Sequence, residues 1–224
     1  MLRTVLQAVI PHYCCSCGGL GSVLCESCKY DIISEYTDRC VQCQRPVAAG
    51  RCTICKVPYE RAWAAGLRRD ALDRLVSTSK FDSVRAGCDM QAALLDQVLP
   101  ELPERSVVVP VPTIARHIRR RGYGHAERIA DRFARRRGVV SARLVKRRAQ
   151  HVQHGSSRRE RQRQAARSYS VADRLDPSTT YIIVDDVFTT GYTVRYVAQQ
   201  LRAAGAKHVW VAVTSRQPTG IDVL

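Results

Sequence analysis

The sequence predicts a protein of the α/β class, with a doubly wound, mostly parallel sheet and a small metal-binding segment at the amino terminus. Two apolar strand patterns, at residues 107–109 and 181–184, each end in a loop that leads into a predicted helix. Continuous apolar strands of this kind are typical of parallel sheets that are covered on both faces. The third observation is a series of four C-x-x-C pairs before residue 58, which is typical of structural metal sites.

The most informative stretch is residues 181–193, which reads Y-I-I-V-D-D-V-F-T-T-G-Y-T. Its first four residues are apolar and rich in β-branched side chains, which predicts a strand buried on both faces. An amphipathic helix pattern follows, with apolar residues at Val194, Val197, Ala198 and Leu201 and a stop signal at Gly205. The polar loop therefore lies at the carboxyl end of a strand, where open α/β sheets bind ligands.

This loop carries groups that suit both ends of a ribose 5-phosphate. Asp185 and Asp186 can accept hydrogen bonds from the vicinal hydroxyls of a sugar. Threonine hydroxyls, backbone N–H groups and a helix amino terminus can hold a phosphate, and Gly191 lets the backbone approach it closely. An ordinary strand followed by a Thr-capped helix would explain one Thr and one Asp. It would not explain two adjacent acids and three Thr around a glycine.

The chain of 224 residues carries a net charge of +16, and the excess is concentrated in one region. Between residues 116 and 174 there are 19 Lys or Arg and 4 Asp or Glu, a difference of +15. Such a region favours a polyanionic partner, such as nucleic acid, a phosphorylated ligand or an anionic membrane surface. The alternative is a solvated, arginine-rich face without a specific partner.

No stretch has the 18 to 20 apolar residues, roughly, that a membrane-spanning helix needs. Residues 1–10 predict a short amphipathic helix that packs on its own domain, with contact to a membrane surface as the alternative. They are too short and too weakly charged for a secretory signal. We therefore expect a cytoplasmic protein, in which cysteines stay reduced and act as metal ligands rather than as disulfides.

The four C-x-x-C pairs predict two tetrahedral zinc sites, because each pair can provide two of the four thiolates. Gaps of 7, 11 and 8 residues separate successive pairs, and the two short gaps favour pairing first with second and third with fourth. A crossed pairing of the first pair with the third also fits. Redox chemistry is the rival interpretation, but it normally uses one pair at the start of a helix. The predicted ligands are Cys14, Cys17, Cys25, Cys28, Cys40, Cys43, Cys52 and Cys55. Cys15 is expected to be spare, and Cys88 to be buried and inert.

The segment V-D-D-V-F-T-T-G-Y-T resembles the phosphoribosyl pyrophosphate (PRPP) loop of type I phosphoribosyltransferases. The resemblance implies that the two acids bind the ribose hydroxyls and that residues 189–193 surround the 5-phosphate. The implied PRPP-binding residues are Asp185, Asp186, Val187, Thr189, Thr190, Gly191, Tyr192 and Thr193. It also implies Mg²⁺ bound together with PRPP. The loop after the strand at 107–109 is then expected to face the pyrophosphate, through Pro112, Thr113 and Arg116.

The order of motifs along the whole chain is similar to that of the competence protein F (ComF) family, including its GntX-type members. The four C-x-x-C pairs precede V-V-P-V-P, then R-R-R-G-Y-G-H-A-E, Q-H-G-S-S-R-R-E-R-Q-R-Q and V-D-D-V-F-T-T-G. This resemblance implies a double zinc ribbon followed by a type I phosphoribosyltransferase domain. It also implies cytoplasmic handling of single-stranded DNA in natural transformation, beside DNA-uptake partners at the inner face of the membrane. The chain departs from the family at Gly124 and His125, where Asn-Gln is common.

We therefore expect three regions: a double zinc ribbon at 1–58, connecting helices that pack on the core at 59–104, and a phosphoribosyltransferase-like domain at 105–224. Residues 147–167 are polar and arginine-rich, and lie where the resemblance places a mobile loop that closes over PRPP. A disordered basic linker is the alternative for this stretch.

Two main hypotheses for function follow. In the first, the protein binds PRPP or a nucleotide together with single-stranded DNA, with phosphate contacts from a basic surface. The candidate residues for nucleic acid are Arg119, Arg120, Arg121, Tyr123, Arg158, Arg161 and Arg163. Tyr123 would stack on a base or simply pack in the fold. In the second, the protein is an active phosphoribosyltransferase that moves ribose 5-phosphate to a nucleobase-like acceptor and releases pyrophosphate. A PRPP-sensing regulator of DNA binding is a third option.

Overall fold

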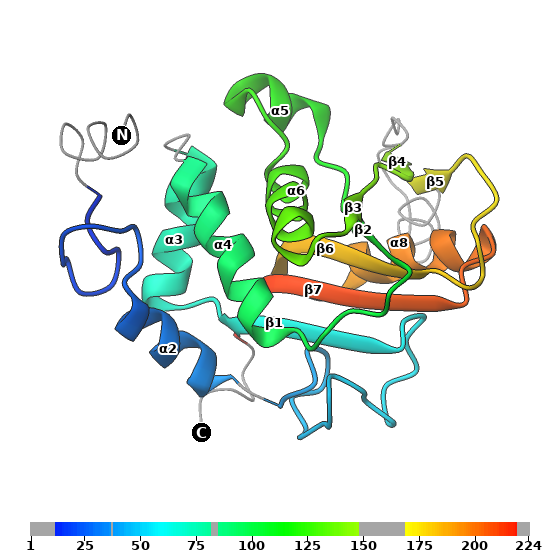
Figure 1. Cartoon of the computed structure of the whole chain (residues 1–224), viewed down its shortest axis with the longest axis horizontal. Coiled ribbons are helices and arrows are strands. Elements are labelled where there is room, and N and C mark those ends of the chain that lie inside the picture. The colour runs from blue at the N-terminus through cyan, green and yellow to red at the C-terminus, as the bar shows by residue number, and fades with distance from the viewer. Residues whose placement is uncertain (1–11, 37, 82–84, 148–168, 219–224) are drawn as a thin grey trace, which may run out of the picture.

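The structure is a computed structural model that describes residues 12–36, 38–81, 85–147 and 169–218. Its centre is a sheet whose neighbouring strands all run parallel, which confirms the predicted fold class (Figure 1). In sheet order the strands are β1 (Arg61–Leu67), β7 (His208–Arg216), β6 (Thr180–Phe188), β2 (Ser106–Pro110) and β3 (Val140–Ser141). The edge strand β1 comes from the region predicted mainly as connecting helices, where residues 63–67 indicate a short strand, and it pairs with β7.

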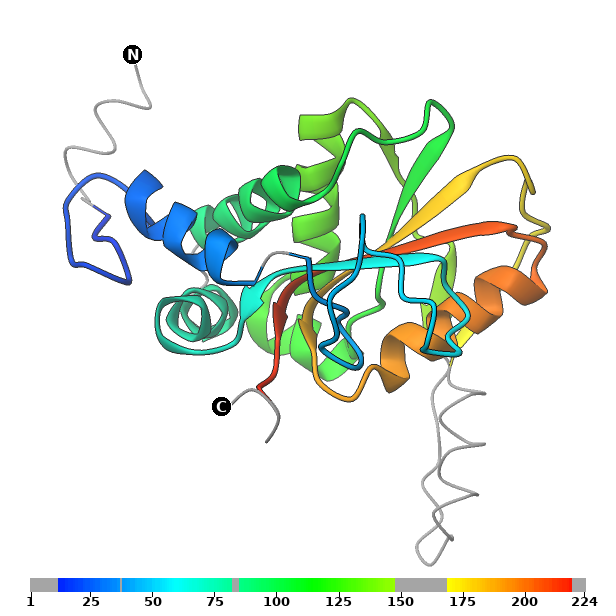
Figure 2. The ribbon, with the colours of Figure 1, turned by 90° about the horizontal axis from the view of Figure 1, so that it is seen from below.

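Helices cover both faces of this sheet (Figure 2). One face is covered by α4 (Arg85–Val98) and α6 (His125–Arg137), which pack Leu95, Ile129 and Phe133 against strand residues such as Ile182. The other face is covered by α8 (Tyr192–Ala203), whose apolar stripe of Val194, Val197, Ala198 and Leu201 is buried as its helical spacing predicts. Burial of both sheet faces explains why the strand sequences are continuously apolar.

The amino-terminal part packs at the end of the molecule that carries β1. The helix α2 (Glu26–Glu35) begins within the second cysteine pair, and α3 (Asp70–Phe81) follows β1. Leu24, Leu72 and Leu75 form a small core there with Leu94 of α4. The short helix α5 (Ala115–Arg121) follows the loop after β2.

A separate two-stranded antiparallel ribbon lies near the start of α8. It consists of β4 (Val145–Arg147) and β5 (Tyr169–Val171), with Arg147 opposite Tyr169. Residues 148–168 lie outside the described residues, and with them all of the predicted mobile loop except Arg147, including the candidates Arg158, Arg161 and Arg163. The predicted helix at residues 1–10 also lies outside them. In the part of the chain that the structure describes, no helix is long and apolar enough to cross a membrane.

One boundary differs from the sequence prediction. The strand expected to end at residue 184 continues to Phe188, because β6 stays paired with β7 as far as Phe188 opposite Arg216. Asp185 and Asp186 therefore belong to the end of the strand and not to the loop after it. Backbone hydrogen bonding holds both acids on a rigid element, which apolar periodicity alone does not reveal.

Candidate functional site

The carboxyl ends of β2 and β6 meet the start of α8 at a cavity of about 240 Å³. This cavity brings together the predicted pyrophosphate loop, both acids and one loop threonine. Its lining consists of Val111, Pro112, Thr113, Ile114, His117, His125, Ala126, Arg147, Tyr169, Asp185, Asp186 and Thr193. Segments more than 70 residues apart in sequence thus contribute to one polar hollow, at the edge where parallel sheets bind ligands.

The two acids at the end of β6 are fixed by hydrogen bonds. The backbone N–H of Asp186 donates to Oδ1 of Asp185 at 2.9 Å, and the hydroxyl of Ser215 donates to the carbonyl of Asp186 at 3.0 Å. The side chain of Asp186 is 16% exposed, and its Oδ2 lies 3.9 Å from Nε2 of His125. Two held carboxylates at a cavity wall can accept hydrogen bonds from adjacent hydroxyls of a sugar.

Sequence reasoning missed His125, which lines the cavity behind Asp186. Its ring is buried and lies in a polar group with Cys88 Sγ at 3.6 Å from Nδ1 and Gln91 Nε2 at 3.3 Å from Nε2. Cys88 is fully buried, as expected, and burial raises the pKa of its thiol to about 11. The sequence did mark this position, because Gly124 and His125 stand where the family commonly has Asn-Gln. It did not show that His125 would lie beside Asp186.

The sequence also did not predict Arg147 and Tyr169 as site residues, although Arg147 begins the polar, arginine-rich stretch at 147–167 and Tyr169 lies just after it. The guanidinium of Arg147 donates to the hydroxyl of Tyr169 at 3.3 Å and lies 5.5 Å from the centre of its ring. Burial raises the pKa of Tyr169, Asp185 adds to this effect, and Arg147 and Thr193 oppose it. The β4–β5 ribbon thus brings a cation to the same cavity as the acids.

The loop before α8 has the features of an anion site. Gly191 is the residue that caps α8, with a left-handed φ of 74°, and no side chain caps the helix. Thr189 and Thr190 are exposed, and Thr193 is half-buried in the cavity wall. The first turn of a helix presents N–H groups without intrahelical partners, which favour a phosphate. The alternative of a Thr-capped helix therefore does not account for these threonines.

We expect Gly191→Ala to destabilise this loop. A methyl group at this position would collide with the ring of Phe188 and lie 3.0 Å from Oε1 of Gln42, and the φ of 74° is strained for alanine. Such strain costs about 1–3 kcal/mol. Urea denaturation of the variant should show this loss, whereas Gly122→Ala, with a φ of 79° and no neighbour within 4 Å, should lose less. Equal losses in the two variants would contradict the predicted steric contribution.

Only some of the predicted nucleic-acid residues have side chains that the structure describes. Arg119 is exposed on α5, whereas the side chains of Arg116, Arg120 and Arg121 are outside the description. The hydroxyl of Tyr123 donates to the carbonyl of Ser79 at 2.5 Å, and the guanidinium of Arg128 lies 5.6 Å from its ring centre. These contacts favour the packing role for Tyr123 over base stacking.

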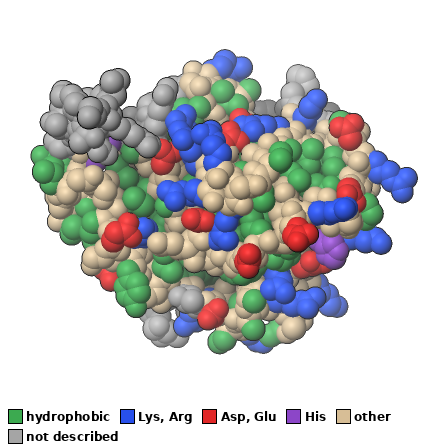
Figure 3. Space-filling model, viewed as in Figure 1, with side chains coloured by type: hydrophobic (Ala, Val, Ile, Leu, Met, Phe, Trp, Pro, Cys, Tyr) green, Lys and Arg blue, Asp and Glu red, His purple; other side chains and the backbone are tan. Residues whose placement is uncertain are grey.

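Acidic side chains neutralise part of the basic region. Figure 3 shows Lys and Arg side chains gathered in the upper middle of one face, with acidic side chains among them. Three of the ion pairs join Arg132 to Asp89 at 2.7 Å, Arg137 to Asp96 at 2.6 Å and Arg143 to Asp131 at 2.5 Å. Some arginines of the basic region thus form ion pairs within the protein and support the packing of α6 on its neighbours.

The predicted cysteine ligands form two groups of four, with the first C-x-x-C pair joined to the second and the third to the fourth. Within each group the sulfur atoms all lie within 4.8 Å of one another, and the groups are Cys14, Cys17, Cys25, Cys28 and Cys40, Cys43, Cys52, Cys55. Sulfur separations of 3.8 Å (Cys17–Cys25), 3.8 Å (Cys43–Cys52) and 4.0 Å (Cys40–Cys55) exceed the disulfide length of about 2.05 Å. They match the edge of about 3.8 Å in a tetrahedron with zinc–sulfur bonds of about 2.3 Å.

The surroundings of these sulfurs also fit a metal. Burial raises the pKa of Cys52, but backbone N–H groups at Cys55 and Ile54 outweigh burial and lower it to about 7. The pKa of Cys55 is raised, first by burial and then by the neighbouring Cys43. Thiols in this proximity cannot all ionise without a cation, and a bound Zn²⁺ supplies that charge. Both groups could therefore hold zinc. Cys15 lies outside both groups, as expected.

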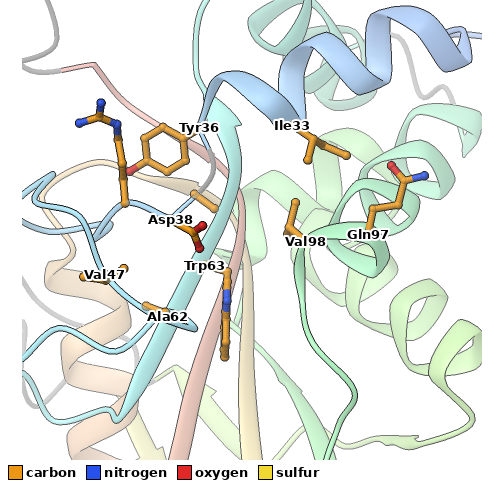
Figure 4. A pocket seen from close by; sticks show the side chains of 11 residues that line it. Ile33, Tyr36, Asp38, Val47, Ala62, Trp63, Gln97 and Val98 are labelled. Carbon is orange, nitrogen blue, oxygen red and sulfur yellow. The ribbon is translucent and has the colours of Figure 1, made fainter.

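A second cavity, of about 140 Å³, lies beside the edge strand β1 (Figure 4). Its walls come from α2, the segment after it, β1 and α4, and include Ile33, Tyr36, Trp63 and Val98. These side chains are mainly apolar, and the charges of Asp38 and Arg39 have opposite signs. This chemistry does not suit a phosphorylated sugar, so the cavity beside Asp185 and Asp186 remains the candidate site.

Comparison with known proteins places this site in context. The model of the phosphoribosyl transferase domain matches residues 117–223. The DNA utilization protein YhgH of Salmonella typhimurium is 29% identical over 203 residues, which cover 84% of this chain and 88% of the relative. Competence protein F of Haemophilus influenzae is 29% identical over 115 residues, covering 50% and 49% respectively. A solved glutamine PRPP amidotransferase from B. subtilis, complexed with ADP and GMP, aligns with 58% of this chain and 26% of its own, at 21% identity and a TM-score of 0.43.

The domain match covers β6, the loop after it and α8, which line the polar cavity, but begins after the β2 loop residues 111–114 that also line it. The matches to YhgH and to competence protein F agree with the order of motifs in the sequence. The parallel sheet and the two four-cysteine groups fit the same architecture. Residues 117–223 thus match the phosphoribosyl transferase domain, and these relatives support the resemblance to the competence protein F family that the order of motifs indicates.

Proposed function

We propose that the protein binds PRPP, as its Mg²⁺ complex, in the cavity between β2, β6 and α8. One observation carries this proposal: the paired acids, the uncapped helix start and the loop after β2 converge on a single cavity. In the proposed complex Asp185 and Asp186 accept hydrogen bonds from the ribose hydroxyls, and residues 189–193 surround the 5-phosphate.

The pyrophosphate of the ligand would face the loop that carries Pro112, Thr113 and Arg116. Arg147 supplies a further positive charge at the cavity wall, where it can pair with a phosphate oxygen. Mg²⁺, when bound with PRPP, would neutralise charge on the pyrophosphate. The protein groups hold and orient the sugar and its phosphates.

Titration calorimetry with PRPP and Mg²⁺ tests this proposal. We expect one PRPP per chain, competition by ribose 5-phosphate, and no comparable heat with a hexose 6-phosphate. A protein that gives no heat with PRPP and no shift in its unfolding temperature would refute the proposed site.

We further propose that the basic region at residues 116–174, with the arginines of α5, binds single-stranded DNA in the cytoplasm. The relatives named DNA utilization protein and competence protein F motivate this proposal, together with the net charge of +16. Binding through phosphates releases counterions, so the affinity should fall steeply with salt and depend little on sequence.

Fluorescence anisotropy with a labelled oligothymidine at several salt concentrations measures this dependence. If the arginines of α5 contact about three phosphates, replacing Arg119, Arg120 and Arg121 with glutamine should reduce the slope of log K against log salt by about 2, at roughly 0.7 per phosphate. Glutamine at Arg132 and Arg136, which lie on α6 near Asp89 and Asp96, is the matched control and should change the slope less. No binding at low salt, or binding that salt does not weaken, would contradict the proposal.

The alternative function is an active phosphoribosyltransferase, favoured by the proximity of the β2 loop and the acids in one cavity. In that reaction an acceptor attacks the anomeric carbon of PRPP as the bond to pyrophosphate breaks. Release of pyrophosphate that depends on one particular nucleobase would establish this activity, and release with none of the bases would favour the binding role.

A further inference from the structure

We propose that the second cysteine cluster, Cys40, Cys43, Cys52 and Cys55, supports the loop at residues 189–193 from behind, so that zinc at this cluster and PRPP at the loop bind cooperatively. Gln42, between two of the cysteines, is the proposed positioning residue. This inference rests on the proposed function, because it assigns that loop to the 5-phosphate.

The turn between Cys40 and Cys43 is embedded in the main core of the protein. Val41 is 1% exposed and belongs to the same apolar cluster as Phe188 and Val194, which flank the loop on either side. Figure 2 shows the segment from residue 38 to 58 beside the edge strand β1, with part of it extending toward α8. The turn between Cys40 and Cys43 thus packs in the same core as the residues on both sides of the loop at 189–193.

Gln42 connects the cluster directly to the loop. Its backbone N–H donates to the sulfur of Cys40 at 3.4 Å, so its position depends on that ligand. Its side-chain Oε1 lies 3.0 Å from where a Cβ on Gly191 would stand. This oxygen is buried and has no hydrogen-bond partner among the described residues. One residue therefore bonds to a predicted zinc ligand and lies beside the glycine at the centre of the phosphate loop.

Three further hydrogen bonds join the second cluster's segment to the elements that hold the loop. The buried Arg216, opposite Phe188 in the sheet, donates from Nε to the carbonyl of Val41 at 2.9 Å. From α8, Arg195 donates to the carbonyl of Lys56 at 3.4 Å and Arg202 donates to the carbonyl of Pro58 at 3.1 Å. The end of β7 and both ends of α8 thus share hydrogen bonds with the cluster's segment.

The first cluster serves as a control, because its neighbours come mainly from α2 and α3, and Val187 of β6 packs against the same small core. Its segment contacts α3, where the thiol of Cys15 donates to the carbonyl of Ala71 at 3.5 Å and Arg74 donates to the carbonyl of Cys15 at 2.5 Å. Leu24, beside Cys25, packs in the small core with Leu72. Zinc at this cluster would organise the region around α2 and α3.

These contacts have a thermodynamic consequence. Zinc fixes the conformation of a C-x-x-C turn, because both cysteines must point at the same ion. Without zinc, the turn that holds Val41 and Gln42 loses this constraint, and the loop above it loses its support. If zinc strengthens PRPP binding in this way, PRPP must strengthen zinc binding by the same factor.

The test compares zinc affinity with and without PRPP in two variants that each retain one cluster. Cys25→Ser with Cys28→Ser leaves the second cluster, and Cys52→Ser with Cys55→Ser leaves the first. Competition with a chromophoric chelator measures the affinity for zinc. Saturating PRPP with Mg²⁺ should raise the zinc affinity of the second cluster at least about 5-fold, within the usual range of allosteric coupling, and leave the first cluster unchanged.

Gln42→Ala provides a test that keeps all eight cysteines. We expect this variant to retain two zinc ions per chain and to bind PRPP at least about 5-fold more weakly than the wild type. Arg45→Ala, which changes an exposed side chain of the same segment between the cysteine pairs, is the control and should bind PRPP as the wild type does.

The outcomes separate the two proposals. A wild-type protein that does not bind PRPP refutes the proposed function and the coupling with it. A wild-type protein that binds PRPP, while zinc affinity at the second cluster is unchanged or Gln42→Ala binds normally, refutes the coupling alone. If Cys52→Ser with Cys55→Ser does not fold, the variant that retains the second cluster and the Gln42 pair still decide between these results.

Discussion

Replacing Asp185 and Asp186 together with asparagine is expected to weaken PRPP binding about 100-fold or more while leaving the fold intact. A hydrogen bond to a charged group contributes about 1.5–3 kcal/mol, so losing two of them costs about 3–6 kcal/mol of binding free energy. Asparagine keeps the side-chain oxygen that accepts from the backbone of Asp186 at 2.9 Å. Calorimetry measures the affinity, and thermal unfolding measures the stability.

A matched control for this variant is Asp173→Asn, which changes an exposed acid after β5. The control should bind PRPP with the affinity of the wild type, because Asp173 does not line the cavity. If the double variant binds PRPP as tightly as the control does, the acids do not hold the ribose and the proposed orientation of the ligand is wrong.

Removing zinc from both cysteine clusters is expected to cause the largest loss of stability. Few large apolar side chains between residues 12 and 58 are buried, chiefly Leu24, Tyr36 and Val41, so the metal must provide much of the stability of this region. Zinc contributes about 10–16 kcal/mol in zinc-finger peptides. A loss of even about 5 kcal/mol would lower the unfolding midpoint of a chain of this size by at least about 10 °C.

Scanning calorimetry before and after chelation measures this effect, with metal analysis to confirm that zinc has been removed. Adding zinc back should restore the original midpoint. The protein with asparagine at both Asp185 and Asp186 should lose stability on chelation to the same extent, because the acids and the clusters act separately on unfolding. An unchanged midpoint in protein shown to lack zinc would contradict the structural role of the metal.

The fold class and the cysteine groups could be predicted because each depends on a short-range pattern. Apolar runs at 107–109 and 181–184 reflect burial on both sheet faces, and the gaps between cysteine pairs restrict which pairs can meet. The amphipathic pattern beginning at Val194 marked α8 for the same reason.

What could not be predicted depends on contacts between distant segments. The sheet pairing that extends β6 to Phe188 comes from β7, and β1 joins the sheet through the same strand. His125, Arg147 and Tyr169 reach the cavity from three separate elements, which no local pattern reveals. Gln42 is an unremarkable polar residue in the sequence, and only the packing of its turn beneath Gly191 relates it to the site.

Diffraction from crystals grown with PRPP and Mg²⁺ tests the central claim most directly. We predict density for the 5-phosphate within hydrogen-bond distance of residues 189–193 and ribose hydroxyls at Asp185 and Asp186. Density for the ligand elsewhere, for example in the cavity beside Trp63, would contradict it, as would an empty site in protein saturated with PRPP.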